Sequence, residues 1–359
     1  MKPLEFVRSW IDRHLAHEEA LLLLVLLTGG LLLVMWLGGT LAPALTALVF
    51  AFILQGVVAR LRSWGVGAQP AIWAAYGLFV TLVVVLLFFV LPLIGRQLYG
   101  FVEALPAILD QVRVFARGLP ERYPTLLTQA QIDMGLEGAR EEIVAAGQLV
   151  VEWLFSRLGS LVSLIIYLVL VPILVFFFLK DKGRLLGWAQ GFLPSERPML
   201  DQVGAEMNLQ IANYVRGKAL EILIVGCAAF ATFWAFDLNY AALLAVLVGF
   251  SVLIPFVGAT LATFPVALVA FGQFGWGLDF GWVLLAYGVL QALDGNVLVP
   301  LLFSEAVDLH PVAIIIAVLA FGGIWGFWGV FFAIPLATLI NSIIKAWPME
   351  TSVSDSGPQ

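Results

Sequence analysis

The chain has 359 residues, of which 62% are hydrophobic and only 12% are charged, and its mean hydropathy is +1.02. This composition excludes an ordinary soluble domain, in which about a quarter of the residues are charged, and the net charge of -6 without a basic cluster argues against nucleic acid as a partner. Because the apolar runs reach the length of about 20 residues that a membrane-spanning helix needs, and are too long for barrel strands, we expect an all-α polytopic protein of the lipid bilayer.

Residues 1–95 are predicted to contain the first three transmembrane helices, near residues 20–37, 41–59 and 70–95. A tight hairpin is expected between the first two helices, at Gly38, Gly39 and Pro43. Glycine permits unusual dihedral angles there, and proline cannot continue the ladder of helical hydrogen bonds.

Basic residues in short loops indicate the orientation of the chain, because such loops normally stay in the cytoplasm. The residues concerned are Arg60, Arg62, Lys180, Lys182 and Arg184. With the helices at the expected positions, both groups fall on the same side as the N-terminus. We therefore expect a multi-pass protein of the bacterial inner membrane with a cytoplasmic N-terminus.

Residues 96–157 are predicted to form an extracytoplasmic helical loop region with breaks at Pro106, Pro120 and Pro124. Apolar residues recur in it at roughly helical spacing, namely Phe101, Leu105, Leu109 and Val112. This pattern predicts amphipathic helices that lie on the membrane or on partner subunits. A small solvated helical cap explains the same pattern equally well.

Residues 158–218 are predicted to contain transmembrane helix 4, near 158–179, followed by a cytoplasmic connector. The prolines of LPSERP at 193–198 mark breaks in the connector. Residues 219–346 form the predicted C-terminal transport region, and residues 347–359 form a polar tail that we expect to be disordered.

Two apolar stretches of the transport region are too long for one straight helix across a membrane. Residues 238–278 would reach about 60 Å as a single helix, roughly twice the hydrocarbon thickness. The segment LIPFVG at 253–258 predicts a break there, because Pro255 removes a helical hydrogen bond and Gly258 frees the backbone.

Residues 309–344 carry a similar interruption, FGGIWGFWG at 321–329, followed by Pro335. The two stretches are either bent spans or re-entrant hairpins, and together resemble a weak internal repeat, FPVAL at 264–268 against IPLAT at 334–338. Interrupted helices of this kind build the substrate sites of transporters. Close packing of helices around glycines is the alternative interpretation.

Asp294 is the leading candidate for a functional residue. It lies in the apolar segment LDGNVLVP at 293–300, in a stretch from Ile222 to Ile344 that has no lysine or arginine. A carboxylate at membrane depth is costly unless it serves a cavity, an ion or a proton. The expected substrate- or ion-binding set also contains the neighbouring polar and helix-breaking residues Gln291, Asn296, Pro300, Pro255 and Gly258. The alternative is that Asn296 and backbone amides satisfy Asp294 for helix packing.

Three further residues are secondary candidates. Glu221 follows Lys218 by three residues, which favours a surface ion pair. Asp308 is expected to cap the last long helix, with Pro311 at an early helical position. His310 between them would either belong to the cap or relay protons at the mouth of the site.

Motifs for nucleotide binding, zinc ligation and nucleophilic catalysis are missing from the sequence, since it contains neither GxxxxGK with Ser or Thr, nor HExxH, nor GxSxG. His14 and His17 lie in the polar N-terminal tail without a partner motif. We therefore expect no enzyme activity, no cofactor and no metal.

Several segments in a fixed order resemble the autoinducer-2 exporter family of membrane proteins, also called PerM or YdiK-like permeases. They are FFFLKDKGRLL at 176–186, LP at 193–194, YVRGK at 214–218, LIPFVGA at 253–259, LDGNVLVP at 293–300, LHP at 309–311 and GFWGVFFAIPLA at 326–337. The N-terminal half agrees mainly in hydropathy and in the long loop after the third helix.

This resemblance implies a permease with about eight membrane segments, some of them broken or re-entrant, that assembles as a homo-oligomer, with a pentamer as the candidate assembly. It implies outward movement of a small polar solute such as autoinducer-2. Proton coupling through Asp294 is expected from the residue itself, because a protonatable carboxylate inside the membrane can couple transport to the proton gradient. The resemblance also places Pro255, Gly258, Asn296 and Pro300 at the translocation site. Family members often carry glutamate where this chain has the shorter Asp294, which would alter the size or ion preference of the pocket.

Two rival functions stay open at the level of sequence. In a sodium or lithium for proton antiporter, Asp294 would alternately bind a proton and a monovalent cation. In a non-transporting scaffold, residues 96–157 would bind partners and the helix breaks would serve packing alone.

Overall fold

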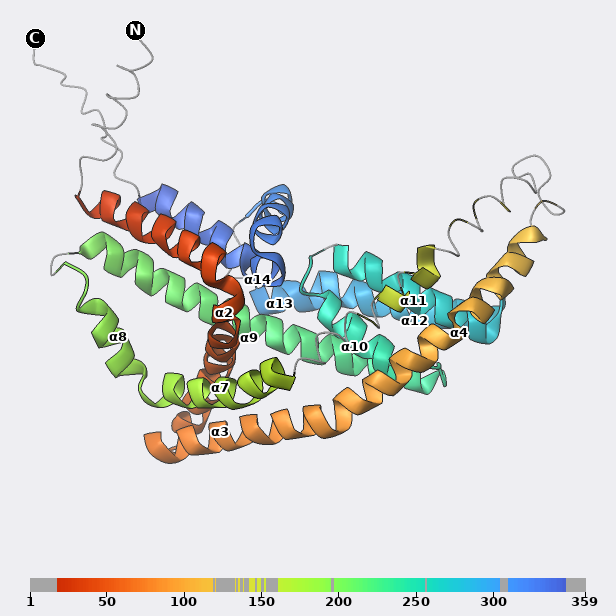
Figure 1. The fold of residues 1–359 in the computed structure, drawn as a ribbon, viewed down its shortest axis with the longest axis horizontal. Coiled ribbons are helices and arrows are strands. Elements are labelled where there is room, and N and C mark those ends of the chain that lie inside the picture. Colours follow the sequence, from red (N-terminus) through yellow and green to blue (C-terminus); the bar gives the residue numbers. More distant parts are fainter. Residues whose placement is uncertain are drawn as a thin grey trace, which may run out of the picture. The chain divides into compact units, whose positions relative to one another are not determined.

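The computed structural model describes residues 18–118, 161–194, 197–255, 257–303 and 309–346, together with positions 120, 133, 135, 138, 142–145, 147–149 and 152. The elements, labelled in Figure 1, are all helical in the described part of the chain. They are α2 (Glu18–Ser63), α3 (Ala68–Val85), the π-helical segment η1 (Leu86–Val90), α4 (Leu91–Arg117), α7 (Leu161–Lys180), α8 (Lys182–Gln190), α9 (Pro198–Ala235), α10 (Ala241–Ser251), α11 (Val257–Phe274), α12 (Leu278–Leu293), the π-helical segment η2 (Asp294–Leu298), α13 (Val299–Phe303) and α14 (Pro311–Ala346).

The all-α polytopic class predicted from the sequence is confirmed. Within the described ranges, six helices are long and apolar enough to cross a membrane, or seven if the bent pair α7 and α8 is one span. The chain divides into two compact units. Unit 1 contains Met1–Thr46, Asp181–Tyr214 and Glu305–Gln359, and unit 2 contains Ala47–Lys180 and Val215–Ser304.

The loop of the hairpin expected at Gly38 and Gly39 is wrong, because the backbone of α2 is helical from Glu18 to Ser63 with Pro43 inside the helix, although the membrane-length span begins at Gly39. A proline removes only the one hydrogen bond that its own N–H would have donated. In an apolar segment, continuing the helix satisfies every other backbone group. Two glycines and a proline therefore do not end this helix.

In unit 2, helices α2, α3 and α7 share one apolar core. The small side chains of Ala47 and Ala51 on α2 leave room for Phe79 of α3 and Val175 of α7, and all four are buried. The ring of Phe79 also lies 5.1 Å from that of Phe50. Small residues opposite large ones let these helices approach closely.

Helices α3 and α4 form one helical run from Ala68 to Arg117 through η1. Pro106 lies inside α4, so the break predicted there is wrong. The helix ends at Arg117, three residues before Pro120, and Pro124 lies outside the described residues. The described part of the predicted loop region thus continues a membrane helix.

The apolar stripe of α4 packs inside the chain, against α11 and against Ile143 and Val144. Leu105, Ile108 and Leu109 are buried together with Leu268 of α11. A side chain on Gly272 of α11 would come within 2.7 Å of Ile108, so glycine allows the two helices to meet. The predicted amphipathic character is present, but its partner is α11.

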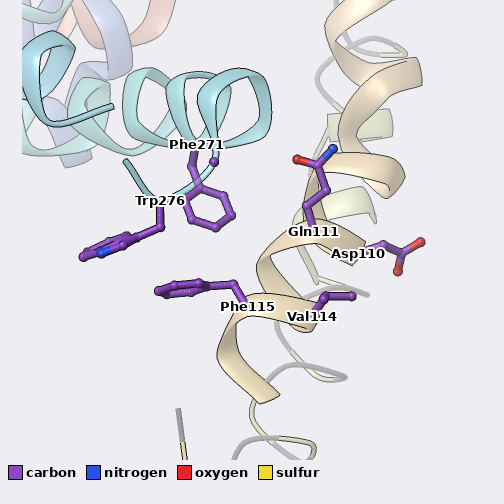
Figure 2. A pocket seen from close by; sticks show the side chains of 7 residues that line it. Asp110, Gln111, Val114, Phe115, Phe271 and Trp276 are labelled. Atoms are coloured by element: carbon purple, nitrogen blue, oxygen red, sulfur yellow. The ribbon is translucent and has the colours of Figure 1, made fainter. Parts of the chain in front are cut away.

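Beyond this contact, α4 and the end of α11 line an open aromatic pocket of about 530 Å³. Figure 2 shows Phe115 facing Phe271 and Trp276, while the carboxylate of Asp110 points away from the rings. The rings of Phe115 and Trp276 are stacked with centroids 5.1 Å apart. The aromatic rings that line the pocket thus connect α4 to the end of α11.

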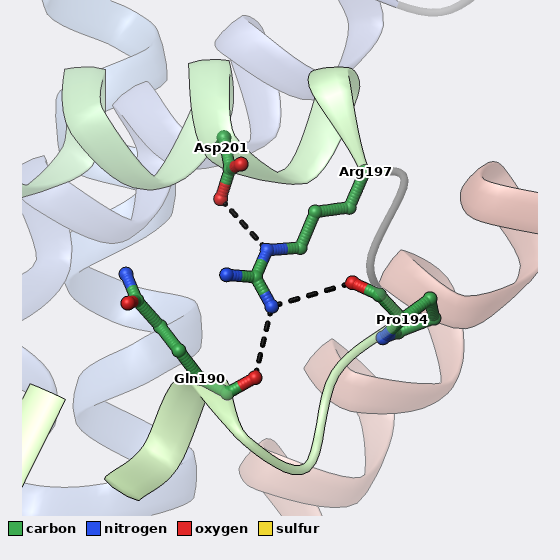
Figure 3. A network of polar contacts seen from close by, with 4 residues as sticks. All are labelled: Gln190, Pro194, Arg197 and Asp201. Atoms are coloured by element: carbon green, nitrogen blue, oxygen red, sulfur yellow. Dashed lines mark hydrogen bonds and ion pairs between the residues drawn. The ribbon is translucent and has the colours of Figure 1, made fainter. Parts of the chain in front are cut away.

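In unit 1, one arginine holds the turn between α8 and α9, where the prolines at 193–198 predicted a break. Figure 3 shows the guanidinium of Arg197 donating to the carbonyl oxygens of Gln190 and Pro194, at 2.9 and 3.4 Å. Its Nε lies 3.0 Å from Asp201 Oδ1 in the first turn of α9. The arginine thereby bonds the last carbonyl of α8, which lacks a partner within the helix, and a carbonyl of the turn that follows.

The break predicted at LIPFVG is present between α10 and α11. Helix α10 ends at Ser251 and α11 begins at Val257, with Pro255 between them. A Cβ on Gly258 would collide with the carbonyl oxygen of Ser251. Only a residue without a side chain therefore allows the chain to turn back so tightly.

Helix α10 also crosses α9 at a close glycine contact. A Cβ on Gly249 would lie 3.0 Å from the carbonyl oxygen of Ile222 and 3.1 Å from the Cα of Gly226. The backbones of the two helices therefore nearly touch. This contact sets the first half of the broken helix against α9.

Helix α14 of unit 1 contains the interruption expected at residues 321–329. Gly326 has φ 60° and ψ -135°, values that are not helical, and the chain bends there. A Cβ on Gly329 would collide with the carbonyl oxygen of Phe321. The two interrupted stretches thus share one local device, a glycine held against a carbonyl seven or eight residues earlier.

Replacing Gly258 with alanine should destabilise the protein. The added methyl group meets the backbone of Ser251, which cannot rotate away as a side chain could, and overpacking of this kind costs about 1–3 kcal/mol. Thermal unfolding of the purified protein in detergent measures the effect. Gly288→Ala on α12 is the matched control, since nothing lies within 4 Å of its Cβ position; equal melting temperatures for the two variants would contradict the tight turn.

Candidate functional site

Asp294 lies at the end of α12, as the first residue of the π-helical segment η2. The cause is local, because Pro300 has no N–H to donate to the carbonyl four residues earlier and its ring crowds that carbonyl. The other π-helical segment, η1, likewise ends two residues before a proline, Pro92. Single π-helical turns inside α-helices are frequent at functional sites.

The carboxylate of Asp294 is half-buried and incompletely satisfied. Its Oδ1 is shielded from solvent and accepts no hydrogen bond from the described residues. The positive charge of Lys218 on α9 interacts with it electrostatically. Because an unpaired buried carboxylate is costly, this group is suited to take up a proton or a cation.

The polar neighbours predicted for Asp294 are turned to other partners. Gln291 donates its amide to the hydroxyl of Tyr287 at 2.8 Å, and this hydroxyl lies 3.3 Å from Thr263 Oγ1. Asn296 donates to the carbonyl of Ala292 within its own helix and is exposed. Tyr287, to which Gln291 donates, therefore connects α12 to α11, and Asn296 bonds its own helix rather than the Oδ1 of Asp294.

Glu221 and Lys218 form a buried ion pair, so the surface pair expected from their spacing is wrong. Lys218 Nζ lies 2.7 Å from Glu221 Oε2. The exposed fractions are only 5% for Lys218 and 1% for Glu221. This Oε2 receives no regular hydrogen bond, so its contact with the ammonium is mainly electrostatic. The spacing of three residues correctly predicted that Lys218 and Glu221 pair. Their burial depends on the packing of α9 against other helices, which the spacing does not show.

Lys218 also links the ion pair to the helix break. Its Nζ donates a hydrogen bond of 2.8 Å to the carbonyl of Val252, the residue directly after α10. It further lies 5.2 Å from the centre of the Phe303 ring. Gly217 makes room for that ring, since a Cβ there would come within 2.7 Å of it.

The predicted helix-breaking residues lie beside this cluster in the chain. Pro255 follows Val252 by three residues and is half-buried, and Gly258 is buried at the start of α11. Pro300 is exposed on α13. The structure thus brings together Asp294, Glu221 and the break at Pro255, through a residue that was not a predicted site residue.

That missed residue is Lys218. One sequence signal could have revealed it: Lys218 is the last basic residue before the long stretch from Ile222 to Ile344 that lacks lysine and arginine. A cation next to such a stretch is a natural counter-ion for its acids. The contributions of the Val252 carbonyl and the Phe303 ring have no comparable signal, because both depend on tertiary packing.

The remaining secondary candidates lie in unit 1. His310 Nδ1 accepts a hydrogen bond of 3.3 Å from the backbone N–H of Val312, and Pro311 is the first residue of α14. His310 therefore provides a cap, the role expected of Asp308, which lies outside the described residues. In the described ranges no group of three or more His, Cys, Asp or Glu side chains could hold a metal ion.

The sequence is similar to known membrane proteins over nearly its whole length. The model of the AI-2E family transporter matches residues 21–349. The "Putative permease PerM" of Escherichia coli K12 is 46% identical over 345 residues, covering 96% of this chain and 98% of that protein. The "Putative transport protein YueF" of Bacillus subtilis is 26% identical over 84% of this chain and 82% of its own length. The "AI-2 transport protein TqsA" of Escherichia coli K12 is 23% identical over 84% of this chain and 85% of its own length.

Removing either partner of the buried ion pair should destabilise the fold strongly. Lys218→Met or Glu221→Gln leaves the other group without its partner, which typically costs about 3–5 kcal/mol, whereas the double variant should lose less than the sum. Unfolding by denaturant in micelles measures the three variants. The exposed pair Asp181–Arg184, at the same spacing and 3.8 Å apart, is the control, and Arg184→Met should change stability by less than about 1 kcal/mol. Additive losses in the double variant would show that the two groups do not interact.

Proposed function

Because this chain belongs to the AI-2E transporter family, we propose that it is a secondary transporter that exports a small polar metabolite in exchange for protons. The single observation that supports this proposal is the buried, unsatisfied Oδ1 of Asp294 beside a broken helix. A group in this state binds a proton or a positively charged partner more readily than an exposed carboxylate does.

The broken helix supplies the moving part in this proposal. Helices α10 and α11 are joined by the short segment 252–256, and the carbonyl of Val252, directly after α10, accepts a hydrogen bond from Lys218. Backbone freed from helical bonding is tolerated in a membrane where protein or a watery cavity covers it. Rocking of this hairpin would expose Asp294 alternately to each side of the membrane, as alternating access requires.

A small, uncharged and polar solute fits the charges available. Lys218 and Glu221 neutralise each other, so the cluster offers one further acidic group and the amide and hydroxyl groups of Gln291 and Tyr287 nearby. Autoinducer-2, the solute in the name of one relative, is the first candidate to test. We place the protein in the bacterial inner membrane, with a cytoplasmic N-terminus, as a homo-oligomer.

A sodium or lithium for proton antiporter is the second candidate. The observation that favours it is the pair of acidic side chains, Asp294 and Glu221, which both interact with one ammonium group. In that mechanism a monovalent cation and a proton compete for Asp294. A scaffold without transport activity would need neither acid.

Asp294→Asn should abolish gradient-driven transport while the protein still folds. The amide keeps the size of the side chain but can neither bind a proton nor carry charge. Uptake of the autoinducer-2 precursor into proteoliposomes, with and without an imposed proton gradient, measures the effect, and the variant should fall to the level of protein-free vesicles.

Asp279→Asn is the matched control, because Asp279 lies exposed in the first turn of α12. It should transport like the wild type. Full gradient-driven flux in Asp294→Asn would remove the coupling role of this residue. Proton release that depends on sodium, without solute flux, would favour the antiporter instead.

A further inference from the structure

The ammonium group of Lys218 occupies a place with the chemistry of a cation site. Three different cation-binding groups surround it in unit 2: the Val252 carbonyl at 2.8 Å, the Glu221 carboxylate at 2.7 Å and the Phe303 ring at 5.2 Å. A carbonyl, a carboxylate and an aromatic face are each known partners of small cations. They come from α10, α9 and α13, so the site is assembled by folding.

The Val252 carbonyl has a special position in this set. It caps the C-terminal end of α10, where the helix carries partial negative charge and its last carbonyls lack helical donors. Transporters with broken helices bind sodium or protons at such C-terminal ends and unwound carbonyls. Here the end of the half-helix is already bound to a positive charge that belongs to the chain.

No basic residue of the long apolar region after Lys218 can take this place. Between Lys218 and Ile344 the sequence has no lysine or arginine. Helices α10, α11 and α13 contribute no ionisable side chain, and among the described residues the acidic groups that interact with Lys218 are Glu221 and, from η2, Asp294. The neighbouring Arg216 packs elsewhere, with its Cδ 3.0 Å from the Cβ position of Gly56 on α2.

We propose that Lys218 is a tethered cation that occupies the coupling-ion site at the helix break, so that this transporter needs no sodium or lithium ion to hold the α10 end in place. The inference rests on the proposed transport function and specifies it further. Protons are then the coupling ion, and Lys218 links Asp294 to the hairpin that must move. This assignment separates the leading function from the antiporter.

Cation-dependent stability tests the assignment without any transported solute. The full chain in lipid nanodiscs is unfolded by heat in sodium, lithium, n-propylammonium or choline chloride at constant ionic strength. The wild type should show the same melting temperature in all four salts. Lys218→Ala should unfold at a lower temperature and should gain about 2–4 °C, saturably, from n-propylammonium, which replaces both the lost ammonium and most of the lost methylene groups.

Two controls make this gain specific. Arg184→Ala, at an exposed position of α8, should respond to no cation, and n-propanol should not replace n-propylammonium in Lys218→Ala. Lys218→Gln, which keeps a donor for the Val252 carbonyl, serves if the alanine variant does not fold, and it should gain stability from sodium or lithium.

Two results would overturn the proposal. If sodium or lithium stabilised the wild type saturably over choline, a metal ion would bind alongside Lys218. If neither Lys218 variant responded to any cation, Lys218 would be a structural partner of Glu221 alone. Failure of autoinducer-2 transport would count against the proposed solute but leave these melting temperatures unaffected, so the two failures can be told apart.

Discussion

The buried contact between Lys218 and Glu221 is the constraint on which the arrangement of unit 2 depends. Moving two charges out of water costs several kcal/mol for each ion, and the attraction between them compensates only when further polar partners are present. The Val252 carbonyl and the Phe303 ring supply such partners for the lysine. Helices α9, α10 and α13 must therefore be in place together before the pair becomes tolerable. An apolar pair of the same volume would pack more cheaply, which is why the charges are best explained by function.

Glycines make the close approach around this pair possible. Gly249 and Gly226 let α10 lie directly on α9, Gly258 lets the chain reverse, and Gly217 leaves space for the ring of Phe303. Each position would place a side chain against backbone or an aromatic ring. In a membrane, where helices gain little from the hydrophobic effect by associating, such contacts are a main source of packing energy. The glycines thus allow the close helix packing that buries the ion pair.

The sequence predicted the features that depend on local chemistry. The helical membrane class, the breaks at LIPFVG and near Gly326, and the exceptional position of Asp294 were all readable from apolar length, glycine and proline. It failed where tertiary packing decides. Pro43 and Pro106 lie inside helices because a long apolar helix tolerates the loss of one hydrogen bond when all its other backbone groups stay paired.

The burial of Lys218 and Glu221 could not be predicted from their spacing, because it too depends on tertiary packing. Residues three apart on a helix form an ion pair on the surface or in the core, and only the neighbouring helices distinguish the two cases. Lys218 therefore escaped prediction as a site residue, although its position before a basic-free stretch was visible. The partner of the α4 stripe was equally hidden, because nothing in the stripe itself specifies α11.

The continuous helix from Ala68 to Arg117 has a mechanical consequence for unit 2. Its 50 residues extend over about 75 Å, with one end packed on α7 and the other on α10 and α11. Because the helix is continuous, displacement of the α10–α11 hairpin would tilt α4 and thereby move α3. The π-helical turn η1 before Pro92 interrupts the regular hydrogen bonding between the two ends, so the helix is expected to bend there. The stiffness of η1 would determine how much of a movement at the helix break between α10 and α11 reaches α3.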